Sequence, residues 1–268
     1  MTANDNGAPE MQTATVELSD SDWQLRMSVS VPSGPMRLND LLPLVRNLAD
    51  AIVQATIKPV EESGQKLSCK KGCGACCRQL VAISTVEAQS LAELVAGMPP
   101  ERQAMIRARF DQSVGRLEEA GLLDRGEPRG DRAPVIKDCG SREASLQELS
   151  RRYFRLQMPC PFLEDESCSI YADRPMVCRE YHVTSPAERC AKLFEQPVDR
   201  VEVPVRLGDV ITRTAQRVNE IPAYSVPLVL ALEWSEKHGE SLKPCHDGMK
   251  MFQTLMSEMA HDQELKIG

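Results

Sequence analysis

The sequence lacks several features that mark well-known functional classes. Aromatic residues make up only 4% of the 268 residues, so we expect a core of Leu, Val, Ala and Met. The most apolar run, Val226–Leu232, is far shorter than the roughly 20 residues that a membrane span requires. The first 20 residues show no basic segment followed by an apolar one, as a secretory signal would. We therefore expect a soluble cytoplasmic protein that does not contact a membrane.

Basic charge and nucleotide-binding motifs are also scarce. The chain has 32 basic and 39 acidic residues, a net charge of −7, which argues against nucleic acid as a ligand because phosphate binding needs a basic face. No strand–helix alternation carries a Gly-rich phosphate loop, and no repeat of 20–50 residues is visible. Neither a nucleotide-binding sheet nor a TIM barrel is indicated.

Cysteine, in contrast, is plentiful and unevenly placed. Eight of the ten cysteines fall in two short segments, and only Cys139 and Cys245 lie elsewhere. We call residues 69–77 the first window and residues 160–190 the second window. Their cysteines are Cys69, Cys73, Cys76 and Cys77, then Cys160, Cys168, Cys178 and Cys190. Burial as small apolar residues is one alternative, but it does not explain two dense clusters. Pairing in disulfides is another, but the cytosol keeps thiols reduced. All-sulfur ligands favour zinc or an iron–sulfur cluster.

The first window reads C-x3-C-x2-C-C. Gly72 and Gly74 let the chain curl so that several side chains converge. Neighbouring side chains diverge, so Cys76 and Cys77 serve two metals, or two irons of one cluster, more easily than one tetrahedral ion. Thiolate needs nearby positive charge, and three basic residues supply it: Lys70, Lys71 and Arg78.

The first three cysteines also match the C-x3-C-x2-C signature of radical-SAM enzymes. Ala75 stands where those enzymes carry an aromatic residue, however, and the barrel pattern is absent. The later cysteines would also be unexplained. This alternative is therefore disfavoured.

The second window begins with a turn and continues into expected helix starts. Cys160 and Cys168 flank an acidic turn, residues 164–166, which we expect to be solvated. Asp173 is a candidate helix cap and Pro175 suits a first turn, which places Cys178 near a helix N-terminus that favours thiolate. Two basic residues, Arg174 and Arg179, add positive charge, and "SPAERC" predicts a further helix start that brings in Cys190.

Three stretches together resemble a known family. "CKKGCGACC", "CPFLEDESCSIYADRPMVCREY" and "SPAERC" are similar to the YkgJ-type cysteine-cluster family, also called the CxxCxxCC family of zinc- or iron-chelating domains, over roughly residues 66–195. The family also includes flagellin lysine N-methylases with an iron–sulfur cluster. The resemblance implies that the ligands are Cys69, Cys73, Cys76, Cys77, Cys160, Cys168, Cys178 and Cys190.

Other residues near the windows have plainer interpretations. His182 could be a ligand or carry a proton, but a structural role is favoured. Tyr171 and Tyr181 are expected to pack over the site. Cys245 and His246 suit a helix start rather than a ligand pair, and Cys139 lies in an expected exposed loop. Ser185 has no visible base, so no hydrolase is inferred.

The patterns predict a mainly helical α+β protein with a few short strands. Residues 1–12 are expected to be disordered, residues 13–65 to form a hairpin and a helix, residues 66–195 the metal-binding domain, and residues 196–268 a strand and helices that pack on it. The expected helices cover residues 38–60, 84–96, the segment from the prolines at 99–100 to 122, and residues 142–156, 223–238 and 246–262. Residues 124–141 are expected to form a loop, and residues 200–207 a strand.

Three functions follow as hypotheses. The first is a protein that holds zinc or an iron–sulfur centre in a structural or redox role. The second is an N-methylase-like enzyme that acts on lysine side chains of a protein partner, although no Gly-rich SAM loop is visible. The third is a carrier or sensor of metal ions. Cysteine-only ligation suits both metals, so the sequence does not choose between zinc and iron–sulfur.

Overall fold

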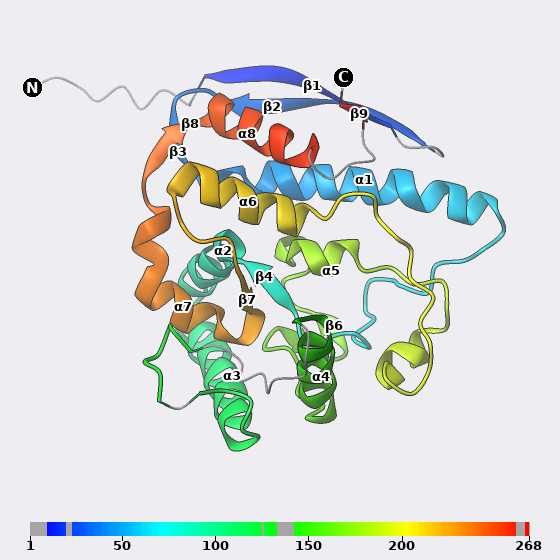
Figure 1. The fold of residues 1–268 in the computed structure, drawn as a ribbon, viewed down its shortest axis with the longest axis vertical. Helices are drawn as coiled ribbons and strands as arrows, with labels where there is room; N and C mark the ends of the chain where they lie inside the picture. The colour runs from blue at the N-terminus through cyan, green and yellow to red at the C-terminus, as the bar shows by residue number, and fades with distance from the viewer. Residues whose placement is uncertain (1–9, 20–22, 125, 133–141, 261–265, 268) are drawn as a thin grey trace, which may run out of the picture.

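A long helix, α1 (Leu42–Glu62), crosses the molecule and separates the hairpin from the cysteine-rich part (Figure 1). Apolar residues at helical spacing, among them Val45, Leu48 and Ile52, are buried, as the sequence predicts. The computed structural model describes residues 10–19, 23–124, 126–132, 142–260 and 266–267. Within these residues no helix is long and apolar enough to cross a membrane.

The predicted hairpin is confirmed as an antiparallel pair, with Val16 opposite Met27. Short strand pairs then connect the beginning of the chain to its end, because β1 also pairs with β9, β3 with β8, and β4 with β7. The strand bounds are β1 (Met11–Ser19), β2 (Gln24–Pro32), β3 (Pro35–Arg37), β4 (Ala82–Ser84), β5 (Leu163–Glu164), β6 (Ser167–Cys168), β7 (Ser225–Pro227), β8 (Cys245–Asp247) and β9 (Lys266–Ile267).

The remaining helices are mostly where the hydrophobic periodicity places them. Ser84 and Glu87 form the predicted capping box at the start of α2, with the Glu87 backbone N–H 3.1 Å from Ser84 Oγ. The helix bounds are α2 (Thr85–Ala96), α3 (Pro100–Glu119), α4 (Arg142–Arg155), α5 (Met176–Glu180), α6 (Leu207–Asn219), α7 (Ala231–His238) and α8 (Gly248–Ala260). Short 3₁₀ turns cover Leu38–Leu41, Tyr171–Asp173, Ala187–Lys192, Leu228–Leu230 and Gly239–Leu242.

Four expectations about the elements were wrong. The strand 200–207 is absent, because Val183 and Arg200 form only an isolated bridge and Pro204 has no N–H to continue a ladder. Helix α6 was missed. The expected helix 223–238 begins with strand β7 and a 3₁₀ turn, and β1 includes two residues assigned to the disordered end, Met11 and Gln12.

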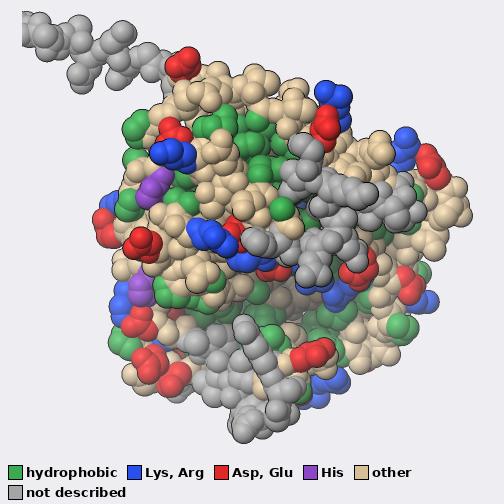
Figure 2. Space-filling view, turned by 45° about the horizontal axis from the view of Figure 1, so that its top comes forward, with side chains coloured by type: hydrophobic (Ala, Val, Ile, Leu, Met, Phe, Trp, Pro, Cys, Tyr) green, Lys and Arg blue, Asp and Glu red, His purple; other side chains and the backbone are tan. Residues whose placement is uncertain are grey.

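One hydrophobic core joins these elements. It draws on the hairpin, on α1 to α3 and on α6 to α8, and it reaches the second window at Phe162 and Met176. On the surface, Figure 2 shows acidic and basic side chains interspersed over the face in view, so that this face carries mixed charge. The cysteine windows are thus attached to a core that both ends of the chain build.

Candidate metal centre

The first window is a series of tight turns. Backbone N–H groups of Cys73 and Cys77 donate to the carbonyls of Lys70 and Gly74, at 3.1 and 3.0 Å. Gly72 has φ of +90°, a conformation that residues with a Cβ rarely adopt. The predicted curling of the loop is therefore present.

The second window is a hairpin followed by short helical turns. Strands β5 and β6 enclose Asp165 and Glu166, both in the left-handed region, and Cys168 closes the ladder opposite Leu163. Cys178 lies in the first turn of α5, as expected. Asp173 does not cap that helix: its carboxylate pairs with Arg46 at 2.7 Å, and the buried Glu87 accepts the Met176 N–H at 2.7 Å instead.

A backbone hydrogen bond, and an ion pair made by the residue that follows the first window, hold the two windows side by side. The Cys160 N–H donates to the Cys77 carbonyl at 2.8 Å, and Arg78 pairs with Glu166 at 2.6 Å. A Cβ on Gly74 would lie 2.9 Å from the Glu166 carbonyl oxygen, so glycine is what lets these backbones approach. The acidic turn is therefore not only solvated but docks on the first window.

Seven of the eight predicted ligands border one cavity of about 110 Å³. They are Cys69, Cys73, Cys76, Cys77, Cys160, Cys168 and Cys178. Apolar side chains complete the wall, including Phe162 and Leu228, and sequence reasoning missed Leu228 because it comes from the C-terminal segment. Within the described ranges, no three Cys, His, Asp or Glu side chains are already arranged to hold one ion. The seven thiols thus lie around one cavity, but they are not in the arrangement that would coordinate a metal ion.

Cys190, the eighth, is buried outside that wall. It interacts electrostatically with Cys69, Cys73 and Cys76. Cys76 also interacts with the second-window cysteines Cys160, Cys168 and Cys178. Cys76 therefore lies within electrostatic reach of thiols from both windows.

Burial shifts these thiols toward their neutral form. It raises the pKa of Cys69 to about 11 and that of Cys160 to about 12, and it raises the pKa of Cys168, Cys178 and Cys190. A hydrogen bond with Cys77, followed by burial, raises the pKa of Cys76. A metal ion binds thiolate and would displace these protons.

The expected positive charge is only partly directed at the thiols. Arg78 pairs with Glu166, and Arg179 pairs with Asp50 at 2.7 Å. Lys70 and Arg174 line the cysteine cavity. The charge of Arg174 lowers the pKa of Cys76 and Cys168, but burial raises the pKa of both thiols by more, as does the hydrogen bond with Cys77 in the case of Cys76. The Arg174 guanidinium also lies 4.3 Å from the centroid of the Tyr171 ring.

His182 and the tyrosines also face this region. Tyr171 and Tyr181 line the cavity, as expected of packing residues, and Tyr181 lowers the pKa of Cys190 in opposition to burial. His182 Nε2 lies 2.8 Å from the Arg179 carbonyl oxygen, and burial lowers the pKa of the ring. His182 therefore has the structural contact that we favoured.

Of the two cysteines outside the windows, Cys245 does not line the cavity. Cys245 is exposed on β8, which ends before α8 begins at Gly248, so it is not in the expected helix start. Cys139 lies outside the described residues.

The comparisons with known proteins agree with the cysteine pattern. The model of the CxxCxxCC family, described as a "Putative zinc- or iron-chelating domain", matches residues 68–197. Neither the curated proteins nor the solved structures gave a match. The matched segment contains both windows and all eight of their cysteines. Residues 68–197, just under half of the chain, are therefore similar to the CxxCxxCC family of domains.

Proposed function

We propose that this protein holds zinc or an iron–sulfur centre through the cysteines of both windows, in a structural or redox role. One observation carries the proposal: seven cysteines, from segments about 80 residues apart, border a single small cavity. Sulfur-only donors fit zinc and iron and suit magnesium or calcium poorly. The proposed ligands are Cys69, Cys73, Cys76, Cys77, Cys160, Cys168, Cys178 and Cys190.

The adjacent pair Cys76 and Cys77 supports a centre with more than one metal atom. Neighbouring side chains diverge and serve two metal atoms more easily than one, and both of these cysteines border the cavity. Zinc would cross-link the two windows when bound, whereas an iron–sulfur cluster would add one-electron chemistry. Lys70 and Arg174 would offset the negative charge of the thiolates.

The surroundings favour a resident centre over a metal that is carried as cargo. The predicted ligands are half-buried, or buried in the case of Cys190, and apolar side chains, including Val81, Phe162 and Ile170, line the cavity that seven of them border. Such a lining limits the access of water to a bound ion.

The test is metal analysis of protein purified without oxygen, together with its absorbance near 400 nm. We expect zinc, or iron with sulfide, in the native protein, and a lower metal content in Cys76→Ser because Cys76 borders the cavity within electrostatic reach of thiols from both windows. Cys245→Ser, which alters an exposed thiol, should keep the full metal content. Native protein that is folded and metal-free would overturn the proposal, as would equal metal content in the two variants.

A further inference from the structure

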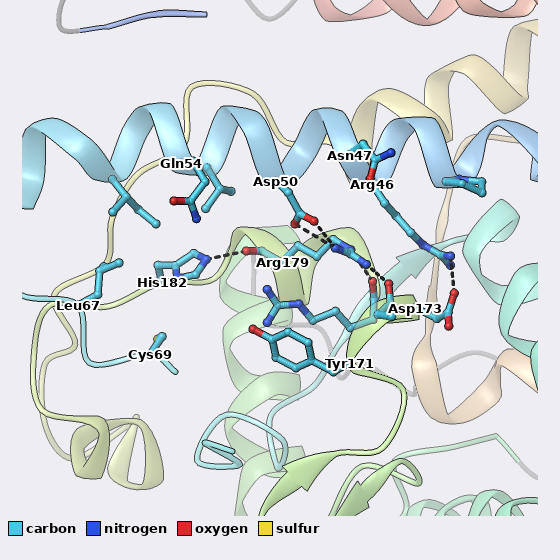
Figure 3. A pocket seen from close by; sticks show the side chains of 15 residues that line it. Arg46, Asn47, Asp50, Gln54, Leu67, Cys69, Tyr171, Asp173, Arg179 and His182 are labelled. Carbon is cyan, nitrogen blue, oxygen red and sulfur yellow. Dashed lines mark hydrogen bonds and ion pairs between the residues drawn. The ribbon is translucent and has the colours of Figure 1, made fainter. Parts of the chain in front are cut away.

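A cleft of about 740 Å³ opens beside the cysteine cavity, between α1 and residues 171–182 (Figure 3). One face of α1 forms its first wall, with Arg46, Asp50 and Gln54 four residues apart. The opposite wall is formed by the turn that starts at Tyr171 and by residues of α5 and beyond. The volume lies within the range of sites that bind small molecules, roughly 300–1,000 Å³.

The charges in this cleft do not balance. Arg46 pairs with Asp173, and Arg179 pairs with Asp50, each at 2.7 Å. Among the described residues no carboxylate pairs with Arg174, whose Nε is buried without a hydrogen-bond partner. The guanidinium of Arg174 therefore keeps a positive charge and N–H donors that a ligand in the cleft could use.

His182 adds an unused acceptor next to this cation. Its Nε2 lies 2.8 Å from the Arg179 carbonyl oxygen, which only accepts, so Nε2 carries the proton. Nδ1 is then an acceptor, and it is buried without a partner in the described structure. A free cation and a free acceptor together suit a ligand with an anionic group and a nearby donor.

We propose that this cleft binds a small organic anion, recognised by Arg174 through a carboxylate or phosphate group and by His182 through a hydroxyl or amine. Four residues line both the cleft and the cysteine cavity: Cys69, Tyr171, Arg174 and His182. A bound anion would therefore lie against the wall of the proposed metal centre. The inference goes beyond metal binding and requires no particular metal.

Calorimetric titration of the protein as isolated tests the proposal with three probes: L-malate, inorganic phosphate and the neutral analogue L-malamide. We expect malate or phosphate to bind and malamide not to bind, and the preferred anion tells a carboxylate ligand from a phosphate ligand. Arg174→Gln should weaken anion binding at least about tenfold, since charge-assisted hydrogen bonds are the strong ones. Arg26→Gln, which alters an arginine with a side chain 78% exposed on the hairpin, should bind as the native protein does.

A second variant separates the cleft from the metal centre. Gln54 is exposed on α1 and does not line the cysteine cavity, so Gln54→Trp should obstruct the cleft and reduce anion binding while metal content stays unchanged. If the native protein is folded and metal-free as isolated yet binds the anion, the result supports the cleft while the metal centre fails its own test. The proposal is overturned if neither anion binds, if malamide binds equally well, or if both variants bind as the native protein does.

Discussion

Gly74 has a role that its backbone conformation alone does not reveal, since its φ is not in the left-handed region. An added Cβ would lie 2.8 Å from Leu163 Cδ1 and 2.9 Å from the Glu166 carbonyl oxygen. The contact is with another segment of backbone, which cannot rotate away as a flexible side chain can. The first window and the β5–β6 hairpin can therefore approach only where this residue lacks a side chain.

We expect Gly74→Ala to lower the free energy of unfolding by about 1–3 kcal/mol, the usual cost of forcing extra volume into a packed site. The displaced hairpin carries Cys168, so metal content should fall as well. Gly115 lies in α3 with nothing within 4 Å of an added Cβ. Gly115→Ala should stabilise the protein by roughly 0.5–1 kcal/mol, because alanine suits a helix better than glycine. Urea denaturation measures both changes, and equal stability of the two variants would contradict the explanation.

At the scale of elements, the β5–β6 hairpin is attached to α3 by Glu164. Its carboxylate lies 2.6 Å from Arg102 and 2.7 Å from Arg109. Hydrogen bonds from Arg102 and then Arg109 hold the pKa of Glu164 below its ordinary value. A lowered carboxyl pKa stabilises the fold fully above the ordinary glutamate pKa, and this stabilisation is lost as pH falls through the lower folded value.

We therefore expect Glu164→Gln to be less stable than the native protein at pH 7, by up to about 1 kcal/mol for this partly exposed pair of contacts. Below the ordinary glutamate pKa the difference should shrink, because the unfolded chain then binds a proton at this residue, and it should be lost once pH falls below the lowered pKa of Glu164 in the folded protein. Thermal unfolding across pH 3–7 measures this change. A difference that stays constant with pH would show that the charge of Glu164 is not responsible.

The same scale shows what sequence patterns can and cannot predict. The capping box at Ser84 and the buried stripe of α1 depend on residues a few positions apart, so the sequence predicts them well. Helix α6 was missed because the alternating residues of "RVEVPVRL" mimic a strand up to its start. Its first N–H, on Leu207, is accepted by Glu180 at 2.7 Å, a partner distant in sequence.

In the candidate site too, some features can be predicted from the sequence and others depend on tertiary packing. Residue type and spacing predict the two cysteine windows, and seven of the eight cysteines do border one cavity. Spacing does not predict that Leu228 lines the cysteine cavity, nor that α1 supplies a wall of the adjoining cleft. Both depend on tertiary packing. Arg46, Asp50 and Gln54, polar at every fourth position of α1, were the available signal for the cleft.

At the scale of the whole molecule, the helices of the core and the two cysteine windows differ in how much of their stability would come from a bound metal. Helices α6 and α8 pack on each other and on the elements around α1, whereas the windows contain mostly turns and short helices. Metal binding should therefore stabilise the windows most.

We expect removal of metal by a chelator to lower the melting temperature, since an ion about 100-fold above its Kd adds about 2.7 kcal/mol. Hydrogen exchange should speed up most in residues 68–80 and 160–190, while the buried amides of α1, α6 and α8 stay protected. Exchange that rises equally across the chain would show instead that the fold and the centre form as a single unit.

The hydrogen bond from the Cys160 N–H to the Cys77 carbonyl also has a consequence for biosynthesis. Chains are made from the N-terminus at about 5–20 residues per second, so the first window leaves the ribosome several seconds before its partner exists. During that interval the four thiols of the first window are present without the cysteines of the second window. A metal ion that binds these four thiols first would compete with the ion that the complete site prefers, so assembly of the proposed centre would depend on the rate of synthesis as well as on affinity.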